Sequence, residues 1–277
     1  MLHGVLNSSL SGITGFVSTK PSLSAFIPSC VFDLDATLVP SYGGAGQTWA
    51  NLVPAPADGS AKTAYDFYLG RTSSPSTDDP TFTGSAGSPS AYFLSDGSDC
   101  FQIPVNTQFL KNLQKTTGGT PHTLALAFRA GPVGTSYTLM ATNAASTLVG
   151  ARVSVNTSGL VQLFYRGDTA AAASPSGALP ALVEGTNYLY VATVDPATGA
   201  IKQWLNSLTG VSGTVVFNSC TSDASGLLTV LSSSNGSSPA PNGTRVYAAS
   251  VFNAVLSDAQ ISALFSAYNT RHGRAYA

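Results

Sequence analysis

The sequence predicts an all-β protein: a two-sheet antiparallel jelly-roll sandwich that ends in a short C-terminal capping helix. About a dozen short strand-like runs follow one another, separated by Gly, Pro and Asn turn signals. The helical periods that βαβ units would place between these runs are missing. One well-specified helix follows the last strand. The chain is therefore expected to divide into an N-terminal arm, residues 1–28, and one β-sandwich, residues 29–277.

Composition narrows the class of protein. Hydrophobic residues make up 43% of the 277 residues, enough for a large core, whereas charged residues make up only 9%, against about 25% in ordinary domains. The net charge is −1 and the 12 basic residues are scattered singly, so the basic patch of a nucleic-acid-binding protein is missing. No apolar run approaches the roughly 20 residues that cross a bilayer. Neither nucleic acid nor membrane insertion is expected.

The N-terminal arm is Ser- and Gly-rich, weakly apolar and without clear periodicity, and it ends at Pro28. It has no Lys or Arg before Lys20, so a secretory signal with a basic first region is not expected. Its apolar residues would gain most by ordering against another protein or a second copy of the chain. The alternative is that the arm covers an edge of its own sandwich.

The strand-like runs begin at "CVFDLDATLV", and the clearest is "HTLALAFRA", where Leu124, Leu126 and Phe128 share one face. "ARVSVN" and "LVQLFYRG" are joined by the turn "NTSG". Residues 106–119 permit a short helix. The long loop-rich region 58–90 is the expected carrier of binding specificity, because binding residues concentrate on loops held by a rigid scaffold.

The end of the sandwich is the best-specified part of the chain. Residues 245–253 alternate as in a strand covered on both faces. Ser257 and Gln260 have the spacing of a capping box, which places a helix at 257–271 with Gly273 just after it. The residues that should face the sheet recur at i, i+3, i+4 and i+7; they are Ile261, Leu264, Phe265 and Tyr268.

Four stretches in this order resemble the laminin-G-like, concanavalin-A-like lectin/glucanase jelly roll, over roughly residues 30–273. They are "VFDLDATLVPSYGGAGQTWANLV" with Trp49, "AYFLSDGSDCFQIP", "LVEGTNYLYVATVDPATGAIKQWLN" and "RVYAASVFNAVLSDAQISALF". The resemblance is to the variant found in bacteriophage virion proteins (decoration, head spike or fibre proteins) and in secreted bacterial proteins. It implies that the last strand returns to the sheet and that the helix caps the sandwich. Asn187-Tyr188 and Gln260 depart from the family pattern, and no sugar or calcium site is transferred.

Catalysis is not expected. Glycosidases need two carboxylates that flank the scissile bond, and the chain has a single glutamate, Glu184. Asp33 and Asp35 lie on one side of a strand, about 6.6 Å apart by strand rise, and would suit such a pair. The favoured interpretation is that they cap neighbouring turns.

No cofactor is expected. Calcium is the one ion for which the sequence offers candidate ligands. Asp96 and Asp99, with Asp78 and Asp79 in the long loop, could supply oxygen ligands to calcium. An ordinary Asx turn around Gly97 is the favoured explanation of the first pair. Four aromatic residues are candidates for stacking on sugar rings, although large aromatics usually pack in cores; they are Tyr65, Phe67, Tyr68 and Tyr92.

Three functions remain open. The preferred one is a non-enzymatic structural protein of the virion surface, which packs on the particle or a second copy through its N-terminal arm and binds host surface glycans. A secreted, extracellular carbohydrate-binding module is the alternative, and a glycoside hydrolase comes last. The first rests mainly on the family resemblance, which is an association rather than a physical argument.

Overall fold

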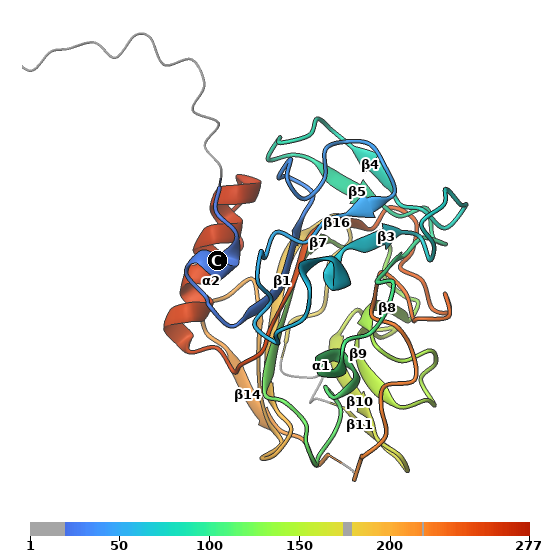
Figure 1. Cartoon of the computed structure of the whole chain (residues 1–277), viewed down its shortest axis with the longest axis vertical. Helices are drawn as coiled ribbons and strands as arrows, with labels where there is room; N and C mark the ends of the chain where they lie inside the picture. The colour runs from blue at the N-terminus through green and yellow to red at the C-terminus, as the bar shows by residue number, and fades with distance from the viewer. Residues whose placement is uncertain (1–19, 174–178, 218) are drawn as a thin grey trace, which may run out of the picture.

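The structure is a computed structural model that describes residues 20–173, 179–217 and 219–277. In this part of the chain two antiparallel sheets pack face to face, and a helix near the C-terminus lies outside one of them (Figure 1). The predicted fold class is therefore confirmed. The sheets are called sheet A and sheet B below.

Sheet A contains the strands that run through the middle of the molecule. Its order is β14-β13-β12-β7-β16-β5-β4, and β1 pairs with the C-terminal half of β16. The long strands β7, β12 and β16 form its centre. The strands span β1 Cys30–Asp35, β4 Thr81–Thr83, β5 Tyr92–Leu94, β7 His122–Arg129, β12 Asn187–Asp195, β13 Ala200–Leu205, β14 Val211–Thr214 and β16 Arg245–Phe252.

Sheet B is built from shorter strands in the order β11-β10-β9-β8-β15-β6-β3-β2. Its longest members, β8, β9 and β10, form consecutive antiparallel pairs. The strands span β2 Thr48–Trp49, β3 Phe67–Leu69, β6 Phe101–Gln102, β8 Tyr137–Ala141, β9 Gly150–Val155, β10 Val161–Arg166, β11 Ala171–Ala173 and β15 Thr229–Val230.

Helices are few. The structure has α1 Gln108–Lys111, α2 Asp258–His272 and the 3-10 turns η1 Leu23–Ala25 and η2 Lys62–Tyr65. α2 begins at Ser257 with both hydrogen bonds of a capping box to Gln260, and it ends at Gly273 in the left-handed conformation (φ 58°). Within the described residues, no helix is long and apolar enough to span a bilayer.

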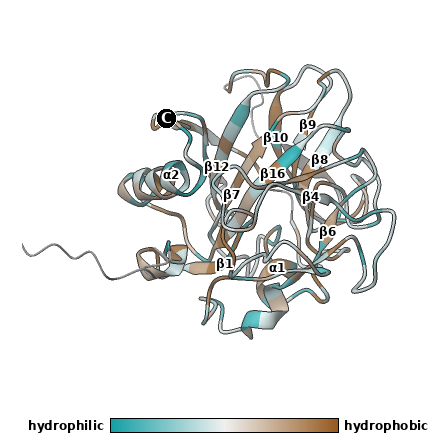
Figure 2. Ribbon diagram, turned by 90° about the horizontal axis from the view of Figure 1, so that it is seen from above, coloured by the Kyte–Doolittle hydropathy of each residue, from teal (hydrophilic) through white to brown (hydrophobic). Residues whose placement is uncertain are grey.

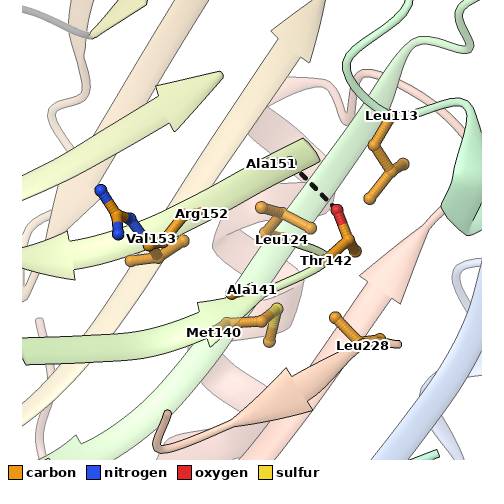
Figure 3. A pocket seen from close by; sticks show the side chains of 9 residues that line it. All are labelled: Leu113, Leu124, Met140, Ala141, Thr142, Ala151, Arg152, Val153 and Leu228. Carbon is orange, nitrogen blue, oxygen red and sulfur yellow. Dashed lines mark hydrogen bonds between the residues drawn. The ribbon is translucent and has the colours of Figure 1, made fainter. Parts of the chain in front are cut away.

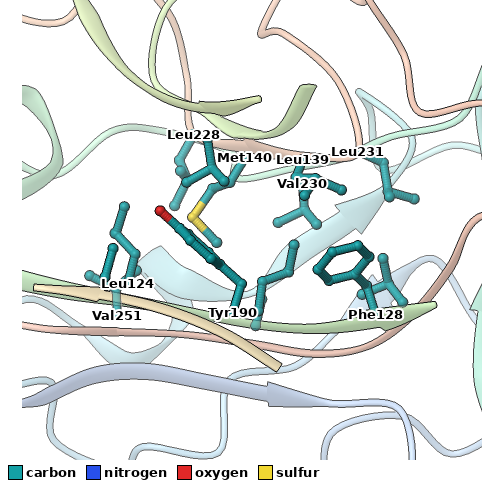
Figure 4. Packing of buried hydrophobic residues seen from close by; sticks show 14 of the residues in the cluster. Leu124, Phe128, Leu139, Met140, Tyr190, Leu228, Val230, Leu231 and Val251 are labelled. Carbon is teal, nitrogen blue, oxygen red and sulfur yellow. The ribbon is translucent and has the colours of Figure 1, made fainter. Parts of the chain in front are cut away.

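The core lies between the two sheets. Side chains of sheet A, such as Leu124, Phe128 and Tyr190, face Met140 and Val230 of sheet B (Figure 4). Trp49, the tryptophan of the first resemblance stretch, is fully buried there with its ring 4.7 Å from that of Phe101. The void that remains near Leu113, Met140 and Leu228 is only about 10 Å³, so it holds one water at most.

The outer face of sheet A is covered by α2 (Figures 1 and 2). The helix stripe expected to face the sheet does so, because each member is at most 1% exposed; the members are Ile261, Leu264, Phe265 and Tyr268. They pack on outward residues of the sheet, such as Val191, Trp204 and Tyr247. The helix therefore gives the sandwich a second apolar layer.

The last nine residues of the expected arm, 20–28, belong to this layer. Leu23 and Ile27 are fully buried in the same cluster as the helix stripe. The Leu23 amide donates to Asp33, and the Pro21 carbonyl accepts from Arg271. Of the expected docking segment, only residues 1–19 remain candidates for docking on a partner. These residues lie outside the described part of the chain.

Candidate functional site

The outer face of sheet B carries an open polar surface over β9 and β10. β9 and β10 alternate strictly between buried and half-buried residues, because successive side chains of a strand point to opposite faces. Their half-buried residues therefore point away from the core. We call four of these outward side chains the polar shelf: Arg152, Ser154, Gln162 and Phe164.

Strand register places the shelf residues in two adjacent rows. Thr138 of β8 pairs with Ser154, which pairs with Gln162. One step along the strands, Arg152 pairs with Phe164. Directly opposed side chains in a sheet have their Cβ atoms about 4.5–5.5 Å apart, so hydroxyl, amide, guanidinium and aromatic groups gather within a few ångströms.

A groove lies over the first row. Its volume is about 130 Å³, the space of roughly four waters at about 30 Å³ each. Its lining is mostly polar and contains a single charged side chain; the lining residues are Ser136, Tyr137, Thr138, Arg152, Ser154, Val155, Asn156, Gln162 and Ser238. It has the size and chemistry to hold a small polar group.

Arg152 is the unusual member of this set. Its guanidinium lies 4.9 Å from the centre of the Phe164 ring, and Figure 3 shows it pointing away from Leu113 and Leu228 in the core. The Nε atom is buried, and within the described residues the side chain has neither a hydrogen bond nor an ion pair. Burial lowers the pKa of Arg152 below its usual value, although an arginine remains charged at any ordinary pH.

Tyr137 borders the groove but pairs with the buried Val155, so its side chain lies on the core side of sheet B. The Tyr137 hydroxyl is buried, and no protein group among the described residues hydrogen-bonds to it. Burial raises the pKa of Tyr137, with the nearby Tyr188 adding to the effect, so the hydroxyl keeps its proton and can donate. The groove therefore contains one buried polar atom, Arg152 Nε, whose hydrogen-bonding capacity the described protein does not use.

Residues 231–238 lie beside strands β6, β15 and β8 of sheet B. Ser234 accepts a hydrogen bond from Gln102 at 2.9 Å, and Ser232 accepts one from Thr229 at 2.7 Å. The Ser238 carbonyl accepts from the Thr138 amide at 2.9 Å, so this segment forms one wall of the groove. The shelf lies on β9 and β10, the next strands of the sheet after β8.

A larger groove, of about 710 Å³, lies on sheet A beside the start of α2. Two of its charged groups form an ion pair, because Lys202 Nζ lies 2.6 Å from Asp258 Oδ1. The third, Asp195, accepts hydrogen bonds within its own turn. Its Trp204 is only 1% exposed: Lys202 lies over the ring, and a Cβ at Gly210 would be 2.4 Å from it. This groove offers no open aromatic face, and each of its charged side chains already has a hydrogen-bond or ion-pair partner.

The predicted carboxylate pair, Asp33 and Asp35, lies under α2 and is fully buried. Arg271 binds Asp33 through two bonds of 2.9 Å and reaches Asp35 at 3.3 Å. Asp35 also accepts from the amide and hydroxyl of Thr37, as an Asx turn does. These contacts agree with the favoured structural interpretation of the pair.

The environment of Asp35 keeps it ionised. Burial opposes ionisation, but the charge and hydrogen bond of His272, together with the charge of Arg271, outweigh it and lower the pKa of Asp35 to about 2. A general acid in a glycosidase needs a raised pKa and access to the leaving oxygen. Asp35 has neither property.

The calcium candidates form turns. Asp96 accepts hydrogen bonds from the amide and hydroxyl of Ser98, which makes the Asx turn around Gly97 (φ 103°). Asp99 accepts from the Asp96 amide, and burial raises its pKa to about 7. Among residues 20–173, 179–217 and 219–277, no group of three or more His, Cys, Asp or Glu is arranged to hold a metal ion. The three cysteines are buried and free.

The four aromatic candidates are scattered. Tyr65 and Phe67 are fully buried and pack on Phe32. Tyr92 is half-buried, with the Arg245 guanidinium 4.3 Å above its ring. Tyr68 is half-buried on β3, the next-to-last strand of sheet B, and pairs there with Gln102. The structure therefore does not bring them together into one sugar-binding surface.

The sequence alone did not identify the shelf residues as a binding site, because their residue types form no recognisable motif. The runs "ARVSVN" and "LVQLFYRG" predict two strands joined by a turn, and their alternation places Arg152, Gln162 and Phe164 on the polar side. That alternation was the available signal. Only the register shows that Arg152 lies opposite Phe164 and that no acidic residue comes with it.

Comparison with known proteins supports the fold. No protein-family model matches the chain, and no curated protein matches it significantly. Among solved structures, the binding domain of botulinum neurotoxin serotype D is similar, with a TM-score of 0.59, 11% identity, and coverage of 88% of this chain and 52% of that one. Trypanosoma rangeli sialidase is also similar, with a TM-score of 0.55, 12% identity, and coverage of 89% and 34%.

This chain thus spans about half of the toxin domain and a third of the sialidase. At such low identity the similarity establishes the fold alone, which is the two-sheet antiparallel β-sandwich. Neither of these two structures is of a virion protein, so the bacteriophage part of the resemblance stays a prediction.

Proposed function

We propose that this chain is a non-catalytic carbohydrate-binding β-sandwich and that the polar shelf is its glycan-binding surface. The observation that carries the proposal is an open polar groove that contains a buried, unpartnered polar atom, Arg152 Nε. Buried polar atoms in proteins nearly always have a hydrogen-bond partner. A ligand rich in hydroxyl groups would supply the missing partner.

The chemistry of the shelf suits a sugar. Gln162 and Ser154 can each donate to and accept from hydroxyl groups, and Phe164 offers an apolar surface beside them. Ligand sites commonly combine a few placed polar groups with aromatic surface. The groove is small, so it would hold one end of a saccharide while the rest lies along the open strands.

The absence of catalysis is part of the proposal. The nine residues that line the shelf groove include no Asp or Glu, whereas glycoside hydrolysis uses two carboxyl groups beside the bond. The one carboxylate pair that the sequence singles out is buried in an ion-pair cluster with Arg271. Both facts disfavour a hydrolase.

Glycan-array screening of the purified protein, followed by calorimetry with the best neutral ligand, tests this function. The double variant Ser154→Ala/Gln162→Ala should raise the Kd about tenfold, since two lost hydrogen bonds amount to about 1.4 kcal/mol or more. Lys202→Ala, in the groove of sheet A, is the matched control and should leave the Kd unchanged. Failure to bind any glycan, equal binding by the double variant, or release of reducing sugar would overturn the proposal.

We further propose a position on a bacteriophage particle, with residues 1–19 as the docking segment. The support is the order of the four sequence stretches that resemble virion jelly rolls. Removal of residues 1–19 should leave the melting temperature unchanged, because the truncated chain keeps the contacts of Pro21 and Leu23 with the sandwich. Proteomics of purified particles should then find the full chain but not the truncated one. Equal incorporation of both chains, or the absence of both, would refute this placement.

A further inference from the structure

We propose that the ligand of the polar shelf is an anionic saccharide, and that Arg152 binds its carboxylate or sulfate group. This inference rests on the proposed function and narrows the class of glycan. It predicts that an acidic group occupies the groove, while neighbouring hydroxyl groups contact Ser154 and Gln162. The observations that carry it are the charge balance of the groove, the position of Arg152 and the size of the space.

The charge balance of the groove is one-sided. Of the residues that line it, Arg152 is the single charged one. The next outward residue on β10 beyond Phe164 is Arg166, whose guanidinium donates to the Thr169 carbonyl at 3.4 Å. This end of the shelf is therefore positive, although the whole chain carries a net charge of −1. An anion would be attracted here by a local field.

Arg152 also differs from two other arginines of the molecule, which have carboxylate partners. Arg271, which is more deeply buried, is held by the two carboxylates Asp33 and Asp35. Arg71 pairs with Asp78 at 2.7 Å. Arg152 has only an aromatic ring beside it, and partly removing a charge from water without a counter-charge is unfavourable. A bound oxyanion would provide the compensation that the described part of the chain does not.

The geometry suits a planar or tetrahedral oxyanion. Phe164 supports the guanidinium, and this kind of stacking leaves the edge of its planar fork available for two parallel hydrogen bonds. Asn156, Gln162 and Ser238 also line the groove and can bond to oxygens next to the acidic group. A space of about 130 Å³ accepts such a group with part of a sugar ring, but not a whole oligosaccharide.

Two pairs of probes that differ in charge alone test the proposal. Trigalacturonic acid is compared with its methyl ester for the carboxylate, and dextran sulfate with dextran for the sulfate. The protein should bind the anionic member of at least one pair tenfold or more tightly, and the successful pair identifies the group. Raising the salt from 50 to 500 mM should weaken this binding and leave the neutral probe unaffected.

Variants locate the effect. Arg152→Gln should remove the preference for the anionic probe, whereas Arg152→Lys, which keeps the charge but loses the fork, should retain part of it. Arg166→Gln is the matched control and should reduce the preference by less than threefold. The salt dependence of the unaltered protein remains a test if an Arg152 variant does not fold.

The outcomes separate this inference from the proposed function. Neutral glycans that bind at the shelf with no preference for either anionic probe would overturn the inference and leave the function standing. A chain that binds no saccharide would overturn both. An unchanged preference in Arg152→Gln would place the anion elsewhere and overturn the inference. Equal affinity for dextran sulfate and a single-stranded DNA oligonucleotide would indicate general polyanion binding, which also overturns it.

Discussion

The outer faces of sheet A and sheet B differ in how far the rest of the chain covers their outward side chains. On sheet A, α2 buries the outward side chains, and every carboxylate in the Asp33–Asp35–Arg271 cluster has a cationic partner. On sheet B, the outward side chains of β9 and β10 stay half-buried, and Arg152 has no partner among the described residues. The first face is covered by a helix of the same chain, whereas part of the second stays open.

This difference indicates where stability and binding reside. A buried charge that loses its partner is strongly destabilising, so substitutions under α2 should affect folding. Substitutions on the polar shelf should weaken ligand binding and leave the stability of the fold nearly unchanged. The comparison can be tested by stability measurements, in the order of their expected effects.

The largest effect is expected from Arg271→Ala. It leaves Asp33 and Asp35 fully buried without their cation, and breaking a buried pair in this way costs about 3–5 kcal/mol. Denaturant unfolding measures the loss. Lys202→Ala, which breaks the more exposed pair with Asp258, is the control and should cost less than about 1 kcal/mol. Equal losses would mean that the buried ion pairs contribute no more to the free energy of unfolding than the exposed pair does.

A similar loss is expected when the apolar contact of α2 is reduced. Leu264 is fully buried between the helix and sheet A, so Leu264→Ala should cost about 2–5 kcal/mol in unfolding free energy. Ser262→Ala, on the exposed side of the same helix, should change it by less than about 0.5 kcal/mol. A loss below that value for Leu264→Ala would mean that the helix does not depend on the sheet.

Acid should weaken the covered face by a smaller amount. The folded pKa of Asp35 is lowered to about 2 from 3.8, so its contribution is present above pH 3.8 and is lost as the pH falls towards 2. The loss is about 2 kcal/mol at 1.36 kcal/mol per pKa unit. Urea titrations between pH 6 and pH 2 measure it. Asp35→Asn should flatten the dependence between pH 4 and pH 2, and an unchanged curve would contradict this assignment.

The smallest effect is expected on the polar shelf. Ser154→Ala and Gln162→Ala should each change the free energy of unfolding by no more than about 0.5 kcal/mol, as open surface positions do. The same thermal and denaturant measurements apply. A loss above about 1.5 kcal/mol would show that the shelf is packed structure rather than open surface, and the contrast between the two faces would disappear.

The sequence by itself determined the fold class, the closing strand and the helix after it. These depend on local information: a period of two along residues 245–252, a capping box at Ser257 and Gln260, and one apolar stripe on the helix. Such features act between residues a few positions apart, so they can be read from the chain alone. The favoured interpretation of Asp33 and Asp35 followed in part from the same local turn chemistry.

Only the tertiary structure decided what lies beside those elements. Asp33 meets Arg271 across 238 positions of the chain, and no local pattern specifies such a pair. The shelf depends on register, because a slip of one residue between β9 and β10 would turn the outward side chains to the core. Register and helix docking follow from burying many distant side chains at once. For that reason the candidate site appears only in the folded molecule.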